Sequence, residues 1–440
     1  MPLRRAVTAA CLATGIAASL VVATSSWGSS AADRVPSAVS GADADLASAE
    51  VASRARPRPW VVTIGDSYIS GEGGRWAGNT SSVPASNMAT NHNPATAGQP
   101  GPVDALGENA YYDGRGHERI QGCHRSESAE VYVGRLRGKN LACSGATTRT
   151  HNRNADDGDF KPGIDFYRGD RGVGQLVALR RFARHHRVTE VALQIGGNDF
   201  GFASIIATCL EDFTKSSPPG VPDQYCKNDP RVLQHFTPQA LKHTTRQIEL
   251  AVQRTGRAMR AAGYRPRQWT LVVQDYPSPL ASGSELRYPE NSNDRLTVGG
   301  CPFFDKDADA AQTLLLGNIN HSVGRAVRHA GLSNTRMLHL RPLFYGSRLC
   351  GKGARQIQET TLSSWRDTGA VDQLEWVNQL YLNKPRPWQL QESIHPNYWG
   401  QLALRSCLRQ AVAGPGTRSG TCRNLGPGLT DRGEPRVALR

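Results

Sequence analysis

The alternation of short apolar runs with longer amphipathic segments constrains the fold of this 440-residue chain more than any other feature. Buried strands are expected where β-branched and apolar residues are contiguous, and helices where apolar residues recur every three or four positions. The expected strands are 60–64, 140–143, 190–195, 269–274 and 337–340. The expected helices are 128–136, 174–185, 238–262, 308–329, 371–381 and 396–412. This alternation predicts an α/β fold with a mostly parallel five-stranded sheet covered on both faces.

Long connecting segments separate these elements, and each is rich in Gly, Pro, Ser or Asn. We expect them to be loop insertions, at 74–122, 201–236, 278–305 and 351–369. The chain has no internal repeat and no clear second domain. We therefore predict one principal domain at 59–412, followed by a C-terminal tail at 413–440.

The N-terminal segment has the pattern of a secretory signal peptide, which we place at 1–32. Basic residues at Arg4 and Arg5 precede a small, apolar run that ends in serines and alanines. An uncleaved membrane anchor is the alternative, but the alanine and glycine content makes the run weakly hydrophobic and favours cleavage. Residues 33–58 read as a flexible linker. Because no later run is long enough to cross a bilayer, we expect a soluble, secreted (extracellular) protein.

The cysteine count agrees with export. Nine cysteines are present, and Cys11 lies within the predicted signal, which leaves an even number for the mature chain. An even set in an oxidising compartment predicts disulfides. Pairing sequential neighbours gives Cys123 with Cys143, Cys209 with Cys226, Cys301 with Cys350, and Cys407 with Cys422. The alternative is a metal site, but no closely spaced Cys or His pair of the zinc type occurs.

The net charge of +14 has two interpretations. It attracts anionic polymers or membrane surfaces, or it belongs to a solvated, arginine-rich surface, which we favour. The basic tract at 180–187, RRFARHHR, lacks the interleaved aromatic residues of a groove for single-stranded nucleic acid. We therefore expect no nucleic-acid partner, and we expect a monomer.

The segment PWVVTIGDSYISGEG, residues 59–73, places Ser67 just after an expected core strand. Serine is a common helix N-cap, because its oxygen accepts a backbone N–H, and this segment alone favours that role. The other interpretation is a nucleophile at the carboxyl end of a strand, where open α/β sheets place their sites.

Two further segments follow expected strands. Gly145 lies in CSGATT, and Asn198 lies in IGGNDFGF. The carboxyl ends of parallel strands meet at one edge of a sheet, so both should approach Ser67. Attack of a serine on a carbonyl creates an oxyanion, which needs donors already aimed at it. The N–H groups of Ser67 and Gly145 and the amide of Asn198 would supply three.

A nucleophilic serine also needs a base, and His395 is the best candidate. It lies in QESIHPNYWG, directly before a proline that favours a helix start and an extended conformation at His395. The imidazole is then presented from a loop. Glu392, three residues earlier, is expected to orient the ring and stabilise the imidazolium.

These four blocks, in this order, resemble the SGNH hydrolase superfamily, also called GDSL esterases and lipases. CHRS at 123–126 is similar to the secreted, disulfide-bonded bacterial branch, and the resemblance covers roughly 59–412. It implies a three-layer, flavodoxin-like fold with Ser67 as nucleophile and His395 as base. It also implies an oxyanion hole that includes Gly145 and Asn198. Catalysis of this kind needs no cofactor.

Two positions depart from the family pattern. Tyr68 stands where the family name has leucine, and we expect its side chain to pack. Glu392 stands where the family usually has aspartate. The alternative to an acid is a dyad in which a backbone carbonyl, that of Ser393 or Ile394, orients His395.

Alternate aspartates at Asp305, Asp307 and Asp309 lack the glycine and glutamate of a calcium loop and read as an acidic helix start. No metal is expected. The sequence therefore predicts a secreted esterase or lipase that cleaves carboxylic esters of a lipid or an acylated carbohydrate. A phospholipase acting at anionic membranes is the related alternative, and a catalytically silent binding protein is the alternative of a different class.

Overall fold

Seven strands form the central sheet of this computed structural model, in the order β11-β10-β9-β8-β7-β1-β2. The structure describes residues 58–80, 103–107, 109–152, 160–216, 222–380 and 391–440. The predicted signal and nearly all of the predicted linker lie outside these residues. The strands of the sheet are β1 Trp60–Gly65, β2 Arg137–Asn140, β7 Val188–Gln194, β8 Thr270–Gln274, β9 Thr335–His339, β10 Gly420–Leu429 and β11 Pro435–Leu439.

The five predicted strands are confirmed as neighbours β2, β1, β7, β8 and β9, all paired in parallel. Numbered along the chain, this order is 2-1-3-4-5, the flavodoxin-like arrangement. The second strand ends at Asn140, where a strand over 140–143 was expected. The chain still runs along β1 beyond this point, because the backbone N–H groups of Leu141 and Cys143 donate to the carbonyls of Thr63 and Gly65 at 2.9 and 3.1 Å.

The sheet has two strands more than predicted, and both lie in the C-terminal segment. β10 adds parallel to β9, and β11 then pairs antiparallel with β10. The sequence of β10, GTCRNLGPGL, gives little strand signal because it is rich in glycine and polar residues. The disulfide between Cys407 and Cys422 instead ties this strand to the preceding helix.

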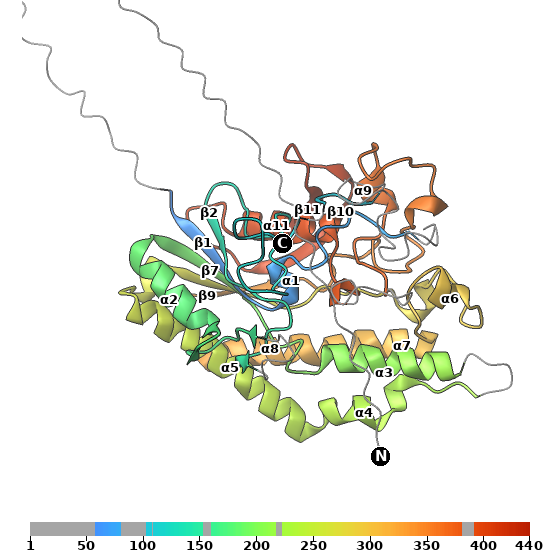
Figure 1. The fold of residues 1–440 in the computed structure, drawn as a ribbon, viewed down its shortest axis with the longest axis horizontal. Helices are drawn as coiled ribbons and strands as arrows, with labels where there is room; N and C mark the ends of the chain where they lie inside the picture. The colour runs from blue at the N-terminus through green and yellow to red at the C-terminus, as the bar shows by residue number, and fades with distance from the viewer. Residues whose placement is uncertain (1–57, 81–102, 108, 153–159, 217–221, 381–390) are drawn as a thin grey trace, which may run out of the picture. The chain divides into compact units, whose positions relative to one another are not determined.

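Helices cover both faces of the sheet (Figure 1). α2, α5 and α8 pack on one face, and α1 and α11 lie on the other, which gives three layers. The helices are α1 Ser67–Ser70, α2 Gln175–His185, α3 Phe202–Lys215, α4 Pro230–Leu233, α5 Pro238–Ala261, α6 Asp294–Thr297, α7 Asp305–Ala310, the π-helical turn η7 Ala311–Leu315, α8 Leu316–Ala330, α9 Ala370–Gln373 and α11 Tyr398–Ala411. Two small pairs of two-residue strands lie outside this sheet. They are β3 His151–Asn152 with β4 Phe160–Lys161, and β5 Arg168–Gly169 with β6 Gly172–Val173.

Four of the six predicted helices are confirmed as α2, α5, the run from α7 to α8, and α11. The prediction at 128–136 is wrong. Four consecutive residues, 128–131, are buried in a run of turns, so the segment does not bury the single stripe of an amphipathic helix. Within 371–380, the described part of the last helix predicted before 396, only the end of α9 is helical, and residues 374–380 are buried without helical structure.

Helix α3 was not predicted, although its sequence is amphipathic. Its residues fell within a segment that we classified by composition as an insertion. This helix matters for the site below. Among the described residues, no helix is long and apolar enough to cross a membrane.

All four predicted disulfides are present in the structure. Each joins sequential cysteine neighbours, which are between 15 and 49 residues apart. Cys209–Cys226 joins α3 to the short 3₁₀ turn Cys226–Asn228, and Cys407–Cys422 joins α11 to β10. The other two disulfides each join two loop residues.

Candidate active site

The turn after β1 gives Ser67 its position. β1 ends at Gly65, and α1 begins at Ser67. Gly65 has a φ of +142°, and a Cβ there would lie 2.0 Å from the carbonyl oxygen of Gln194 on β7, so only glycine fits. The cap of α1 is Asp66, whose carboxylate accepts the N–H of Tyr68 at 3.3 Å. The capping role that Ser67 alone suggested therefore belongs to its neighbour.

His395 lies against Ser67. Its Nε2 is 2.7 Å from the Ser67 Oγ, and its Nδ1 is 2.9 Å from the carbonyl oxygen of Ser393. A carbonyl only accepts, so Nδ1 carries the proton and Nε2 is free to accept the hydroxyl proton of Ser67. Burial lowers the pKa of His395 below its usual value, although the charge of Glu72 acts in the opposite direction. The ring is therefore neutral at neutral pH, as a general base must be.

The loop before His395 is held in an unusual conformation. Ile394 is buried and has a φ of +63°, a left-handed conformation that is strained for a β-branched residue. The hydroxyl of Tyr68 donates to the Ile394 carbonyl at 2.9 Å and so fixes this turn. Tyr68 packs as predicted, with 4% of its surface exposed, and it also links α1 to the histidine loop.

Glu392 does not occupy the position predicted for an orienting acid, because the Ser393 carbonyl is there. The Glu392 carboxylate instead accepts hydrogen bonds from Trp76 Nε1 at 3.0 Å and from the Tyr111 hydroxyl. Burial raises its pKa to about 7. The left-handed turn at Ile394 brings the Ser393 carbonyl back to the ring, while the Glu392 side chain leaves toward residues of the first long insertion.

The two other predicted segments also reach this edge of the sheet. Gly145, which has a φ of +75°, follows β2, and Asn198 follows β7. The Asn198 side-chain nitrogen donates to the carbonyl of Ala146 at 2.9 Å, which joins the two loops. Asn198 and Ser67 line the same pocket. An amide nitrogen carries two donors, so one N–H of Asn198 is used here and the other is left for a ligand.

Sequence reasoning missed Tyr276, which follows β8 at the same edge. Its hydroxyl donates to Asp66 and accepts the N–H of Gly197 at 3.0 Å. It thus joins the Ser67 turn to the Asn198 loop. Burial raises the pKa of Asp66 to about 7. The position of Tyr276 after a central strand was the available signal, since Ser67, Gly145 and Asn198 also follow strands.

An apolar pocket opens beside Ser67. Its empty space, including the part open to solvent, is about 960 Å³. Helix α3 and the π-helical turn η7 supply much of the wall, with Phe202, Ile206, Phe236 and Leu314 among the lining residues. This α3 is the helix that sequence analysis did not identify.

The predicted acidic helix start is present, since α7 begins at Asp305. Within the described part of the chain, no group of three or more His, Cys, Asp or Glu side chains is arranged to hold a metal ion.

Two of the solved structures that match this chain have low sequence identity to it. One is an extracellular lipase from Streptomyces rimosus, with 18% identity over 78% of this chain and 94% of the lipase, at a TM-score of 0.38. The other is a phospholipase A1 from Streptomyces albidoflavus NA297, with 16% identity over the same shares of the two chains and a TM-score of 0.38. No family model and no curated protein matches this chain.

Proposed function

We propose that this protein is a secreted serine hydrolase of the SGNH type, which cleaves carboxylic esters with an apolar acyl chain. The contact of 2.7 Å between Ser67 Oγ and His395 Nε2 carries the proposal, because it pairs a buried hydroxyl with a neutral base at the carboxyl end of the sheet. The predicted signal peptide and the four disulfides support secretion.

The reaction follows from this pair. His395 Nε2 takes the Ser67 proton while Oγ attacks the ester carbonyl carbon and forms a tetrahedral oxyanion. The oxyanion collapses, the bond to the alcohol oxygen breaks, and that oxygen takes the proton from Nε2. Water then attacks the acyl-Ser67 ester, again giving its proton to Nε2, and the acid leaves as Ser67 regains a proton. The Ser393 carbonyl accepts from Nδ1 throughout and keeps the ring oriented.

In this mechanism the oxyanion is stabilised by the N–H groups of Ser67 and Gly145 and by the free N–H of Asn198. The hydrogen bonds of Asn198 to Ala146 and of Gly197 to Tyr276 support the assignment, because they hold these donors before charge develops.

The apolar pocket beside Ser67 supports the proposal that the enzyme recognises an apolar acyl group of its substrate. An alkyl chain that enters it leaves water for a wall of aliphatic and aromatic side chains. Burial of each methylene is worth about 0.8 kcal/mol, or roughly fourfold in affinity.

We therefore expect kcat/KM on p-nitrophenyl esters to rise with acyl length from acetate to medium or long chains, by up to about fourfold per methylene. Ile206→Trp should fill part of the pocket. It should lower kcat/KM on the long esters by about 10-fold and change kcat/KM on the acetyl ester little.

Ala207→Trp is the matched control, since Ala207 is exposed on the same helix and should leave the chain-length profile unchanged. A profile that falls steadily from acetate would contradict the apolar acyl substrate. If the protein binds these esters but hydrolyses none of them, the result would favour the catalytically silent binding protein.

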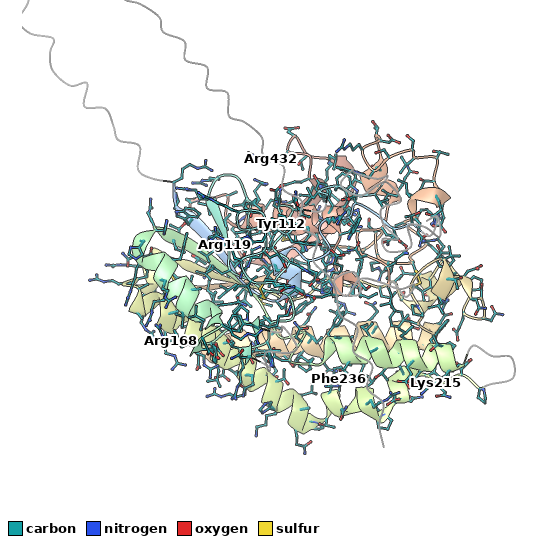
Figure 2. All side chains as sticks on the ribbon, in the orientation of Figure 1. Tyr112, Arg119, Arg168, Lys215, Phe236 and Arg432 are labelled. Carbon is teal, nitrogen blue, oxygen red and sulfur yellow. A yellow bond between two sulfur atoms is a disulfide. The ribbon has the colours of Figure 1, made fainter. Side chains whose placement is uncertain are left out.

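A phospholipid should be assayed beside the simple esters, because the charge of +14 favours an anionic interface. Exposed cations such as Arg119, Arg168, Lys215 and Arg432 lie well apart in the view of Figure 2. Activity that increases on vesicles containing anionic lipid, and that decreases with salt, would identify the phospholipase alternative.

Glu392→Gln tests whether His395 needs an acid. The substitution leaves the Ser393 carbonyl on Nδ1, and a carboxyl whose pKa is about 7 is partly neutral already at neutral pH. We expect kcat to fall by less than about 10-fold, since the ring-fixing hydrogen bond is retained. A loss of roughly 10³-fold or more, in a variant with an unchanged circular dichroism spectrum, would restore Glu392 as the third member of a triad.

A further inference from the structure

Glu72 is a buried carboxylate that the mechanism above does not use. It follows the nucleophile's own helix, and its backbone N–H donates to the carbonyl of Ser67 at 3.2 Å. No part of its side chain is exposed. Burying a carboxylate is costly unless it is paired and hydrogen-bonded, so its partners indicate what it holds.

Its two closest partners come from two other segments of the site, and the side-chain nitrogen of Gln391 also donates to the carboxylate at 3.4 Å. One carboxylate oxygen is 2.7 Å from Nδ1 of His124, and the other accepts from the hydroxyl of Ser144, which directly precedes Gly145. Gln391, near the histidine loop, donates to Ser144 Oγ at 2.7 Å. The carboxylate therefore connects the nucleophile turn to the loop that carries a proposed oxyanion donor.

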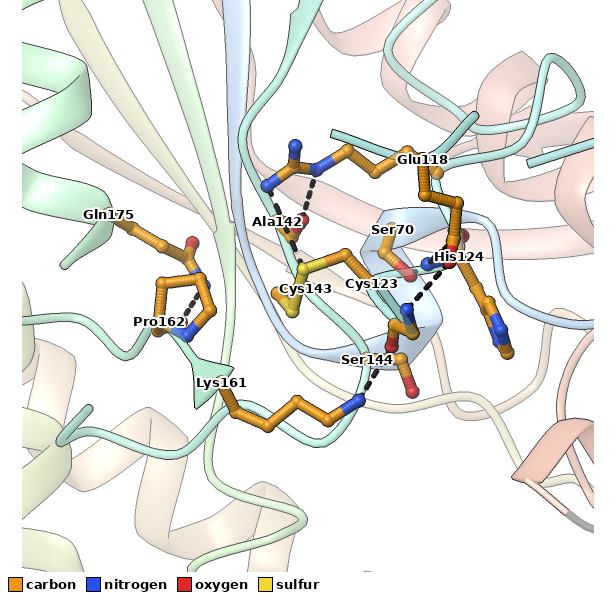
Figure 3. Close-up of a disulfide and its surroundings, with 12 residues drawn as sticks. Ser70, Glu118, Cys123, His124, Ala142, Cys143, Ser144, Lys161, Pro162 and Gln175 are labelled. Carbon is orange, nitrogen blue, oxygen red and sulfur yellow. Dashed lines mark hydrogen bonds between the residues drawn. A yellow bond between two sulfur atoms is a disulfide. The ribbon is translucent and has the colours of Figure 1, made fainter. Parts of the chain in front are cut away.

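One disulfide aligns both partners. His124 follows Cys123 and Ser144 follows Cys143, and these cysteines are bonded to one another with their Cα atoms 4.1 Å apart (Figure 3). The N–H of Ser144 also donates to the carbonyl of Cys123 at 3.1 Å. The disulfide holds His124 and Ser144 close together, and the Glu72 carboxylate contacts both of these side chains.

Glu72 also acts on His395. Its neighbour Gly73 lies against the histidine, where an added Cβ would be 3.2 Å from the His395 Cβ. The charge of Glu72 acts to raise the pKa of His395 and that of His124 acts to lower it, while the rings of Tyr68 and Phe202 lie against the imidazole. Glu72 acts more strongly than His124, so the net field favours the protonated imidazole that forms during the reaction.

The charges on this pair are set by their contact. Burial acts to raise the pKa of Glu72, but His124, His395 and Ser144 together outweigh burial and leave the pKa below its usual value. Burial likewise acts to lower the pKa of His124, but Glu72, with smaller contributions from Glu392 and Glu118, leaves that pKa above its usual value. Glu72 is therefore ionised at neutral pH.

We propose that Glu72 is a positioning residue for ester hydrolysis: its carboxylate holds the Ser144–Gly145 loop at the oxyanion site and supplies the negative charge that supports protonated His395. The inference rests on the proposed function. A backbone carbonyl orients His395, and the carboxylate of Glu392 is turned away from it. The negative charge of Glu72 therefore stabilises His395 when the ring becomes protonated.

Glu72→Gln should lower kcat by about 10- to 100-fold with little change in KM, because one oxyanion donor is displaced and the imidazolium loses support. The acid limb of the kcat/KM profile should also move to lower pH, by about half a unit or more, because removing the carboxylate lowers the pKa of His395. Measuring kcat and this limb on the ester chosen by the chain-length screen tests both parts.

Ser144→Ala separates the two effects. It removes the hydroxyl that the carboxylate holds but keeps the charge, so kcat should fall while the acid limb stays in place. If Glu72→Gln does not fold, Ser144→Ala still tests the loop-holding part, because it deletes only one hydroxyl. Glu72→Asp, which keeps the charge, should have the same acid limb as the wild type. Glu130→Gln is the matched control, because Glu130 is equally buried, bonds to Gln274 and should keep both kcat and the limb.

A Glu72→Gln variant with nearly wild-type kcat would overturn the inference, and so would a lower kcat with an unmoved acid limb, which indicates structural damage alone. If Glu72→Gln does not fold, nearly wild-type kcat in Ser144→Ala would overturn it instead. In either case, wild-type ester hydrolysis that is lost in Ser67→Ala shows that the proposed function still stands. If Ser67→Ala is as active as wild type, the proposed function itself has failed.

Discussion

Ser67→Ala should remove about 10⁴-fold or more of kcat while leaving the fold intact. The hydroxyl is the group that bonds to the acyl carbon in the proposed reaction, and no other hydroxyl is in contact with His395 Nε2 among the described residues. KM should change little, because the pocket that holds the acyl chain does not depend on this oxygen. The measurement is kcat on the best p-nitrophenyl ester.

The fold of the variant can be checked by circular dichroism and by its melting temperature. Removal of one hydroxyl from a position that is 6% exposed leaves a small change in volume, so both should match the wild type. Turnover within about 10-fold of wild type in such a folded variant would reject Ser67 as the nucleophile.

His395→Ala should cost about as much as loss of the serine, because the two side chains act as one unit. Without the imidazole, the Ser67 hydroxyl keeps its proton and the leaving alcohol has no acid. The Ser67→Ala, His395→Ala double variant should then be hardly slower than either single variant. Additive losses in the double variant would contradict a shared step.

The pH dependence gives a second test of His395. Burial lowers its pKa, and the base must be neutral to act, so activity is lost only as the pH falls below that lowered value. The acid limb of kcat/KM should therefore have its midpoint below about 6.5, the usual imidazole value. A midpoint clearly above this value would mean that a nearby negative charge, and not burial, controls the ring.

The parts of the site that the sequence predicted well are those tied to strand ends. In a parallel sheet the carboxyl ends of neighbouring strands meet, so a serine after β1 and an asparagine after β7 must approach one another. Gly65 pairs with Gln194 in the register, which brings these two strand ends level. Only the local pattern of each strand was needed for that prediction.

The orientation of His395 could not be predicted in the same way. It depends on the left-handed backbone at Ile394, which nothing in an isoleucine indicates, and on the partners of Glu392. Trp76 and Tyr111 are more than 280 residues away from Glu392 in the chain and lie in an insertion with no periodic pattern. The acid was therefore placed by its spacing from His395 alone.

Composition was a misleading guide in two segments of the chain. The segment from 201 to 236 reads as a loop, although α3 within it forms a wall of the pocket. The segment after residue 412 reads as a tail, although β10 and β11 complete the sheet. In both places neighbouring structure and a disulfide, Cys209–Cys226 or Cys407–Cys422, support elements whose local signal is weak or was overlooked.

Labelling with a fluorophosphonate tests the central claim most directly, because the reagent bonds only to a serine activated by a base. After peptide mapping by mass spectrometry, we expect a single phosphonylated residue, Ser67, with loss of ester hydrolysis in proportion to labelling. The same treatment should leave Ser67→Ala unlabelled and should label His395→Ala at a greatly reduced rate. Phosphonylation of a different serine in the active wild-type protein, or full hydrolysis after complete labelling of Ser67, would contradict the account.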